Sequence, residues 1–369
     1  MKEVKIKDIC EKGSSNLKQK DVENKNGSYP VFGASGLIGH LDTYHQENSY
    51  IAIVKDGSGI GRVTFMPPQS SVIGTMQYIL PKTDYDIKYI GYCLQSLDLS
   101  KYKQGAAIPH IYFRDYGERL VKVVDSLSEQ KEIVEYLDSS FAKIDKLKEN
   151  AANNLEEAKA LFQSALKDAL EPKEGWEEKT LGEMVKDVKY GTSKPACADG
   201  AYTYLRMNNI TSDGHLDLND TKTISLDDKE LEKCIVRKGD ILFNRTNSYE
   251  HVGKTCVFTE ETPMVIAGYI IRIRLKECLN PYYMNYFFNM KDTKAKLRKI
   301  SVGAVHQSNI NAKAVQTVVI PLPSLSEQQS IVSFLDSLNE KVNTLQQNYS
   351  RICDECDALK QAILRQVFE

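Results

Sequence analysis

One segment of this 369-residue chain occurs twice. Residues 126–138, SLSEQKEIVEYLD, return 198 residues later as SLSEQQSIVSFLD at 324–336, and nine of the thirteen positions are identical. A repeat at so long a period carries a whole domain in each copy, unlike the unit of about 20 to 50 residues in a solenoid. In each copy a mixed stretch comes first and a long helical pattern follows it. The chain is therefore predicted to fold in the order domain, helix, domain, helix, with internal pseudo-twofold symmetry.

Each repeated segment begins a long helical pattern. Apolar residues recur every three or four positions over 133–166 and over 331–367, and neither run contains Pro or Gly. Ser126 and Ser324 each precede a glutamate by three residues, which is the capping-box pattern of a helix start. About 45 residues at about 1.5 Å per residue give a rod of about 65 to 70 Å. One rod cannot bury its own apolar stripe, so the two helices are predicted to pair as an antiparallel coiled coil.

The distribution of charge divides the chain at the same places. Residues 1–124 hold 16 Lys plus Arg against 13 Asp plus Glu, and residues 173–322 hold 22 against 19. Residues 125–172 and 323–369 are acidic, with 6 against 11 and 4 against 7. We therefore predict two α+β domains at 1–124 and 173–322, separated by spacer helices at 125–172 and 323–369. Weakly basic domains suit a phosphate backbone, whereas acidic helices suit a protein partner or solvent.

Several classes of site and location are disfavoured by the sequence. We expect a cytoplasmic protein without a signal peptide, and no apolar run approaches the roughly 20 residues that a membrane span needs. The eight cysteines lack a framework spacing and are predicted to be free thiols. Cys353 and Cys356 form a C-x-x-C inside the second helix, without the further ligands that a zinc site requires. His40, His45 and His215 have no metal-ligand spacing either.

Two short motifs resemble catalytic signatures. Residues 280–283, NPYY, approach the N-P-P-[YF] motif that holds a flipped adenine, but the second proline is absent. Residues 57–61, GSGIG, resemble a dinucleotide-binding loop, but a strand pattern follows where a helix is required. We therefore expect neither to form an active site.

The two globular segments share a unit of strand, loop and strand. Strands are predicted at 50–54 and 62–65 in the first segment and at 240–243 and 254–258 in the second. The loops between these strands differ in length and chemistry. A duplicated scaffold with dissimilar loops can read two different half-sites at a fixed separation.

This layout resembles the specificity subunit of type I restriction-modification systems. The resemblance rests on the duplicated order of domain and helix, and on the P-x-P-x-x-x-E-Q signature at 321–328, PLPSLSEQ. The first copy departs from the signature, because Val123 and Asp125 stand where the second copy has its two prolines. The resemblance covers essentially the whole chain.

The resemblance implies a non-catalytic DNA-binding subunit. Each target-recognition domain would read one half of a bipartite, asymmetric site in double-stranded DNA. The paired helices would set the spacing and dock methyltransferase subunits, two in number, through which restriction subunits would join. S-adenosylmethionine, ATP and Mg would be used by those partners, and this chain would bind no cofactor.

The candidate DNA-binding residues are those whose side chains suit bases and phosphates. Arg and Lys read guanine, Asn and Gln read adenine, and Lys, Arg, Ser, Thr and Tyr hold phosphates. In the first domain the candidates are Lys55, Ser58, Arg62, Lys101, Lys103, Gln104, His110, Tyr112 and Arg114. In the second they are Asn244, Arg245, Thr246, Asn247, Ser248, Tyr249, His251, Lys254, His306, Gln307 and Asn309. We interpret Trp176 as a packing residue rather than a base-stacking one.

Two other functions are compatible with parts of the sequence. A non-enzymatic coiled-coil scaffold with two domains that bind peptides or sugars would also need paired helices. The salt dependence of duplex binding separates that scaffold from a DNA-binding protein. A fused methyltransferase has no room, because the repeat occupies both globular segments.

Overall fold

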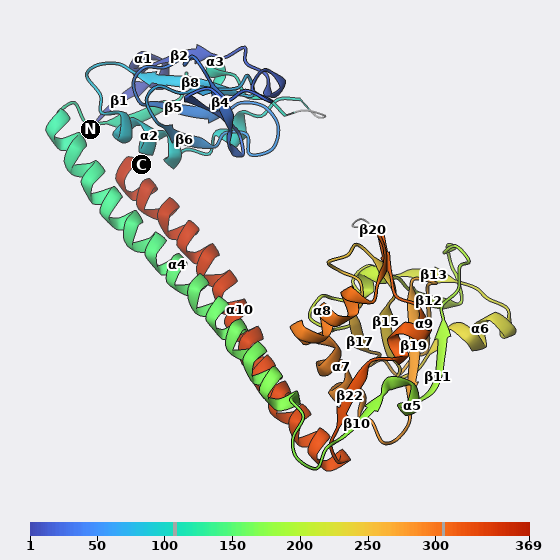
Figure 1. Ribbon diagram of the computed structural model, residues 1–369. Helices are drawn as coiled ribbons and strands as arrows, with labels where there is room; N and C mark the ends of the chain where they lie inside the picture. The colour runs from blue at the N-terminus through green and yellow to red at the C-terminus, as the bar shows by residue number, and fades with distance from the viewer. Residues whose placement is uncertain (106–108, 305–306) are drawn as a thin grey trace. The chain divides into compact units, whose positions relative to one another are not determined.

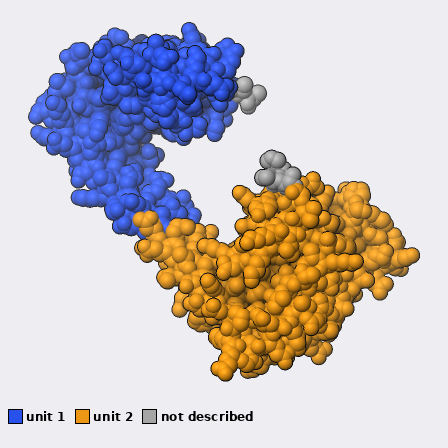
Figure 2. Space-filling view, viewed as in Figure 1, with its two compact units in different colours: residues 1–152, 348–369 blue, residues 153–347 orange. Residues whose placement is uncertain are grey.

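The computed structural model describes residues 1–105, 109–304 and 307–369. These residues form two compact units, one of residues 1–152 with 348–369 and one of residues 153–347 (Figure 2). Each unit contains one globular domain and a stretch of both long helices, α4 (Leu127–Leu170) and α10 (Leu325–Phe368) (Figure 1). The α+β class predicted from the sequence is confirmed.

The first unit is built on a four-stranded antiparallel sheet with the strand order β2-β8-β5-β6. A second sheet has the order β4-β3-β7, with β3 and β7 parallel, and β1 pairs with β9. The elements are β1 (Lys2–Lys5), α1 (Ile6–Ile9), β2 (Cys10–Ser14), η1 (Gln19–Asp21), β3 (Tyr29–Gly33), β4 (Gly36–Leu41), β5 (Tyr50–Val54), β6 (Val63–Met66), β7 (Ser71–Val72), β8 (Met76–Pro81), α2 (Ile87–Ser96), η2 (Leu99–Tyr102), α3 (Phe113–Tyr116) and β9 (Leu120–Val123).

The second unit repeats this plan. Its main sheet has the order β11-β19-β15-β17, a second sheet has the order β13-β12-β18-β14, and β10 pairs with β22. A small sheet, β16-β21-β20, lies beside them. The elements are β10 (Glu177–Thr180), α5 (Leu181–Met184), β11 (Val185–Tyr190), β12 (Tyr202–Leu205), η3 (Met207–Asn209), β13 (Lys222–Ile224), α6 (Asp228–Cys234), β14 (Ile235–Val236), β15 (Ile241–Asn244), β16 (Thr246–Asn247), β17 (Thr255–Val257), β18 (Met264–Ile266), β19 (Ile270–Leu275), α7 (Pro281–Asn289), α8 (Lys291–Lys299), β20 (Val302–Ala304), β21 (Gln307–Asn309), α9 (Ala312–Gln316) and β22 (Val319–Leu322).

The strand β5 is apolar throughout because both of its faces are covered. All five of its residues are buried. Successive side chains of a strand point to opposite faces. Accordingly, Ile51 and Ile53 join the core that contains α2, whereas Ala52 and Val54 join a separate cluster with Val72 of β7. The equivalent strand β15 is likewise fully buried.

The long helices run antiparallel in each unit. In the first unit, Lys148 Nζ lies 2.9 Å from Asp357 Oδ1 and Lys360 Nζ lies 2.5 Å from Asp145 Oδ1. The residue number therefore rises along α10 as it falls along α4. In the second unit the apolar stripes share one core, whose members include Leu166, Leu170, Ile331, Val332 and Leu335. The predicted antiparallel pairing of the helices is confirmed.

The repeated segment begins each helix as the capping pattern predicts. Ser126 Oγ accepts a hydrogen bond from the backbone N–H of Glu129 at 3.5 Å, and Ser324 Oγ accepts one from Glu327 at 3.3 Å. These bonds satisfy amides that lack a partner within the first turn.

Within the repeat, a buried glutamine connects each long helix to its globular domain. Gln130 and Gln328 are both fully buried. Gln130 Oε1 accepts from the backbone N–H of Asp86 at 2.7 Å, and Gln328 Oε1 accepts from that of Asn280 at 2.7 Å. Asp86 and Asn280 are themselves the N-caps of α2 and α7. The glutamine in the repeated SLSEQ therefore joins the start of one helix to the start of another.

The last residue of the repeat makes a second connection. Tyr92 Oη of α2 donates to Asp138 Oδ1 at 2.5 Å, and Tyr286 Oη of α7 donates to Asp336 Oδ1 at 2.6 Å. The same two contacts in each copy thus explain why the glutamine and the final aspartate of the repeat are identical.

The other sequence motifs have structural roles. Asn280 Oδ1 accepts from the backbone N–H groups of Tyr282 at 2.8 Å and Tyr283 at 3.3 Å, so NPYY is the start of α7. Trp176 packs against the core of the second unit and donates its indole N–H to Glu327 Oε1 at 3.1 Å, which confirms its packing role. All eight cysteines are free, and none of the helices in the described parts is long and apolar enough to cross a bilayer.

Candidate nucleic-acid interface

In the first domain the candidate residues lie on two segments joined by backbone hydrogen bonds. Strand β5 is followed by the loop 55–62, and the chain later returns beside this loop. Lys55 O accepts from the backbone N–H of Ile111 at 3.0 Å, and Gln104 and His110 form a reciprocal backbone pair at 2.8 and 2.9 Å. Residues about fifty positions apart in the sequence, such as Lys55 and His110, are therefore brought onto one surface.

Three of these candidates form a cluster of aromatic and cationic side chains. The ring of His110 lies 4.1 Å from that of Tyr112, and Arg114 Cζ lies 4.5 Å from the centroid of the Tyr112 ring. His110 also contacts the carboxylate of Asp56. The neighbouring Lys55 is half-buried, and this burial lowers the pKa of its ammonium group, with a smaller effect from the positive charge of Lys12. The Arg114 guanidinium stays exposed and can bind a base edge or a phosphate.

The remaining candidates of the first domain are exposed to solvent: Ser58, Arg62, Lys101, Lys103 and Gln104. Arg62 donates to the carbonyl oxygen of Ala34, and Gln104 Nε2 donates to Asp115 Oδ2 at 2.8 Å. Lys101 Nζ lies 3.9 Å from Asp98, and the Lys103 ammonium has no hydrogen bond or ion pair to any described residue. A ligand can contact these side chains without any change in the packing of the hydrophobic core.

The second domain carries the same scaffold. Arg245 O accepts from the backbone N–H of Ile310 at 2.8 Å, just as Lys55 O accepts from Ile111. Lys55 and Arg245 are each the first residue after the corresponding inner strand of their sheets, β5 and β15. The two domains therefore place a cation at the same point.

Both loops also end in the same way. Gly61 and Gly253 have φ of +83°, a conformation that residues other than glycine rarely adopt. Gly61 N donates to Val54 O at 2.8 Å, and Gly253 N donates to Asn244 O at 2.9 Å. The loops differ only between these shared ends.

Arg245 is held in place by a tyrosine that the sequence analysis did not identify. Arg245 Cζ lies 4.9 Å from the centroid of the Tyr190 ring, and its Nη1 donates to Gly268 O at 3.4 Å. Tyr190 Oη in turn accepts from the backbone N–H of Ala312 at 2.9 Å. Tyr190 ends β11 and is 43% exposed. No local pattern links residue 190 to residue 245, since their contact depends on the pairing of β11 and β15 with β19.

The structure separates the other candidates of the second domain into inner and outer groups. Asn244 is fully buried, with its Nδ2 3.5 Å from Met207 O, so its side chain does not reach the surface. Thr246 is nearly buried, and its Oγ1 donates to Asn309 Oδ1 at 3.0 Å. The outer group is Asn247, Ser248, Tyr249, His251, Lys254 and Gln307. His306 lies outside the described residues.

A basic helix beside this loop was also absent from the predicted residues. Arg298 of α8 donates to Glu250 O at 3.4 Å, which places the end of α8 against the loop. Burial lowers the pKa of Lys254, and burial followed by the charge of Arg298 lowers the pKa of Lys294 to about 8. The signal in the sequence was five cations within the nine residues of α8.

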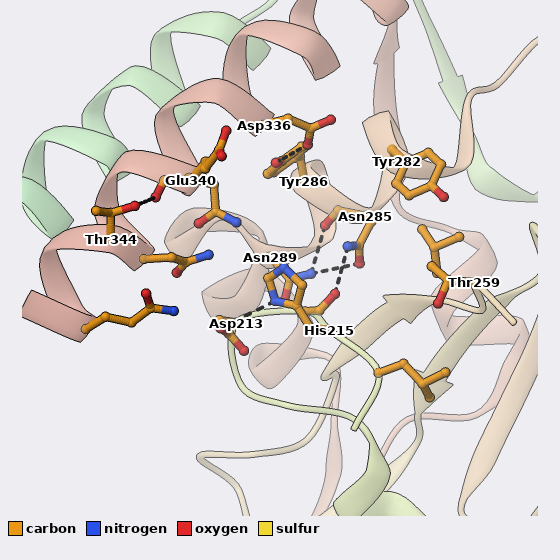
Figure 3. A pocket seen from close by; sticks show the side chains of 16 residues that line it. Asp213, His215, Thr259, Tyr282, Asn285, Tyr286, Asn289, Asp336, Glu340 and Thr344 are labelled. Atoms are coloured by element: carbon orange, nitrogen blue, oxygen red, sulfur yellow. Dashed lines mark hydrogen bonds and ion pairs between the residues drawn. The ribbon is translucent and has the colours of Figure 1, made fainter. Parts of the chain in front are cut away.

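The second unit also contains a polar pocket of about 570 Å³ between α7, α10 and the segment 213–216 (Figure 3). Three carboxylates, from Asp213, Asp336 and Glu340, lie on its wall. The ion pair with His215 lowers the pKa of Asp213 and raises that of His215. None of the predicted DNA-binding residues lines this pocket. Its carboxylates disfavour a phosphate ligand, and the described residues contain no group of three ligands able to hold a metal ion.

A known family accounts for the duplication. A family model described as the type I restriction modification DNA specificity domain matches residues 1–157 and 173–352. The chain belongs to this family. Each matched range contains one globular domain with part of a long helix, so the specificity domain corresponds to the repeat found in the sequence.

Curated relatives include other specificity subunits. The type I restriction enzyme EcoKI specificity subunit of Escherichia coli strain K12 is 25% identical over 261 residues, covering 66% of this chain and 56% of the relative. A specificity subunit of Methanocaldococcus jannaschii is 30% identical over 178 residues, covering 47% of this chain and 41% of the relative. The matched part thus spans about half the length of these relatives.

Solved structures share the fold of this specificity-domain protein. A chain from a structure of the type I R-M system has a TM-score of 0.73 at 19% identity, covering 98% of this chain and 96% of that one. The HsdS subunit from Thermoanaerobacter tengcongensis has a TM-score of 0.54 at 19% identity, with coverage of 98% and 95%. Both matches extend over the two domains and the two long helices.

Proposed function

We propose that this protein is the DNA sequence-recognition subunit of a type I restriction-modification complex. Each globular domain reads one half of a bipartite, asymmetric target in double-stranded DNA. The observation that carries the proposal is the shared position of Lys55 and Arg245 on a duplicated scaffold whose surrounding loops differ. Equivalent cations fit the repeating phosphates and the guanine edges of a duplex, and dissimilar loops fit two different half-sites.

The two loops offer different chemistry for reading bases. The first presents the cluster of His110, Tyr112 and Arg114. The second presents Arg245 on Tyr190, together with the half-buried Asn247 and Ser248 and the exposed Tyr249. An arginine reads guanine through two parallel donors, whereas an asparagine reads adenine. The two half-sites are therefore expected to differ in sequence, which makes the target asymmetric.

In this proposal the helices space the half-sites and dock two methyltransferase subunits. The proposal draws support from large apolar side chains that α4 and α10 leave exposed, including Leu147 at 58%, Leu161 at 71% and Phe334 at 52%. Exposed apolar residues along a helix suit a protein partner. Restriction subunits join through the methyltransferase. The chain itself is non-catalytic and cytoplasmic, and the partners use S-adenosylmethionine, ATP and Mg.

The proposal is tested by mapping N6-methyladenine in the source genome with and without this gene. We expect methylation to disappear at one bipartite motif and to remain unchanged elsewhere. An unchanged methylome, with the partner methyltransferase expressed, contradicts the proposal. Duplex binding by the purified chain then tests the scaffold alternative, because a scaffold would lack the steep salt dependence of phosphate contacts.

Exchanging the loops tests which half each domain reads. Replacing loop 55–62 should change one half of the methylated motif, and replacing loop 244–254 should change the other. A change in the same half from both exchanges would contradict the division of the target between the domains. The first replacement leaves β5 intact, because that strand ends at Val54. The second begins at Asn244, the buried last residue of β15, so asparagine is kept at that position to preserve the scaffold.

A further inference from the structure

The helix α8 carries more positive charge than its stability requires. Five of its nine residues are Lys or Arg, and Asp292 is its only acidic residue. Cations near a helix C-terminus are favoured by the helix dipole, which explains Lys296, Arg298 and Lys299. The dipole disfavours Lys291 and Lys294 in the first half of the helix. A role outside the helix is therefore needed to explain the full set of cations.

The helix is fixed to the second domain by one face and turns three of its five cations outward, whereas Lys294 Nζ donates to Ser212 O at 2.6 Å and Arg298 donates to Glu250 O. Thr293 and Leu297, one turn apart, are both buried. Lys291, Lys296 and Lys299 are exposed, and none of the three ammonium groups forms a hydrogen bond or an ion pair with any described residue. Their charge is not neutralised by the protein and is available to an anionic ligand.

The position of α8 connects this charge to the candidate recognition loop. Arg298 donates to Glu250 O, and Leu297 Cδ1 lies 3.3 Å from the point where a Cβ on Gly253 would stand. The chain continues from Lys299 into the hairpin of β20 and β21, which pairs with β16 directly after Arg245. The cations of α8 thus continue the surface that begins at the recognition loop.

In the first domain the corresponding segment is the short helix η2, whose Leu99 packs against Gly61 as Leu297 of α8 packs against Gly253. There α2 ends at Ser96 and η2 begins at Leu99, whereas α7 is followed by the nine residues of α8. This segment of the first domain carries two cations, Lys101 and Lys103, against the five of α8, so the second domain has more positive charge beside its loop.

We propose that α8 is a phosphate-binding surface that holds the DNA backbone beside the recognition loop of the second domain. This inference rests on the proposed function of the chain in DNA recognition. It assigns to α8 contacts with the phosphates, which fix the position of the duplex but carry no base sequence information. The second domain should therefore make more phosphate contacts than the first.

The test is the salt dependence of binding to a random-sequence duplex by the full chain. Each lost phosphate contact lowers the magnitude of the slope of log Kobs against log salt by about 0.9. The double variant Lys296→Gln, Lys299→Gln should thus reduce it by about 2. Arginine at both positions should retain the slope. Both side chains are exposed, and glutamine has a helix propensity close to that of lysine, so folding should be unaffected.

A matched control is available on α6, which lies on the opposite side of the second unit from α8 (Figure 1). Lys229 and Lys233 are exposed and free of hydrogen bonds and ion pairs to described residues, and their double replacement by Gln removes the same charge. An unchanged slope is expected for this control. An equal decrease in both variants, or none in the α8 variant, would overturn the inference. If the wild-type chain binds DNA without salt dependence, the proposed function itself fails.

Discussion

Replacing Gln328 by Ala should destabilise the second unit without weakening the helix that carries it. The carboxamide makes three hydrogen bonds: Nε2 donates to Pro323 O at 2.9 Å and to Cys278 O at 3.0 Å, and Oε1 accepts from Asn280 N at 2.7 Å. Each bond contributes about 0.5 to 1.5 kcal/mol net, and each buried partner left unpaired costs about 1 to 3 kcal/mol. Water entering the vacated space offsets part of that cost, so we expect a loss of about 2 to 4 kcal/mol in the free energy of unfolding. Alanine is the best helix former, so α10 itself gains slightly from the change.

The assay is thermal unfolding of the full chain followed by circular dichroism and calorimetry. For a unit of this size, about 1 kcal/mol shifts the midpoint by about 2 to 4 °C, so the transition of the second unit should fall by about 5 to 15 °C. Gln130→Ala should lower the transition of the first unit instead, because Gln130 makes the equivalent contact there.

The control for this prediction is Gln329→Ala. Gln329 is the next residue, it is exposed, and its single bond is from Asn280 Nδ2 at 3.0 Å. We expect its replacement to change the midpoint by less than about 2 °C, as for most surface substitutions. If Gln328→Ala and Gln329→Ala have equal effects, the buried glutamine does not connect the helix to the domain, and the explanation of the repeat is wrong.

Three further predictions concern the DNA-binding surface and its surroundings. Arg245→Ala should weaken specific duplex binding by about 1 to 3 kcal/mol and relax the methylated motif at one position, whereas Lys103→Ala should lower the affinity for all duplex sequences alike. If Arg245→Ala leaves both affinity and motif unchanged, Arg245 does not belong to the interface. Tyr190→Leu should weaken binding as Arg245→Ala does, while Tyr190→Phe keeps the ring beneath Arg245 and should retain most affinity; equal losses would show that the ring does not position the arginine. The pKa of Lys294 is lowered from 10.5 to about 8 in the folded protein, so between pH 8 and pH 10.5 the unfolded chain binds more protons than the folded one. The free energy of unfolding should therefore rise from pH 8 toward pH 10. Urea unfolding at several pH values should show a smaller rise for Lys294→Met.

Much of the fold was accessible from local patterns. The spacing of apolar residues identified both long helices, and Ser126 and Ser324 identified their starts within one residue, because caps and helical period are encoded by neighbours in the chain. The strands at 50–54 and 240–243 were recognisable because a strand covered on both faces is a short apolar run. The repeat then implied that both domains share one scaffold.

The site was accessible only in part. Loops rich in Arg, Asn and Tyr were visible, but composition does not tell which side chains turn inward. Asn244 has the residue type of a base reader and is fully buried, because the apolar strand before it continues for one more residue. The cations of α8 were equally visible in the sequence, but their relevance to DNA binding depends on the contact of Arg298 with Glu250. The spacing of residues along the sequence does not predict that contact.

The sequence by itself determined the duplication, the order of domains and helices, and the residue types available on the loops, since each of these is a local or periodic property of the chain. Only the tertiary structure decided that Lys55 and Arg245 are equivalent, that Tyr190 supports Arg245, and that Gln130 and Gln328 join their helices to the domains. These are pairings between residues 44 to 65 positions apart. They depend on strand register and on which faces pack together, and the chain fixes those only when the whole sheet has formed.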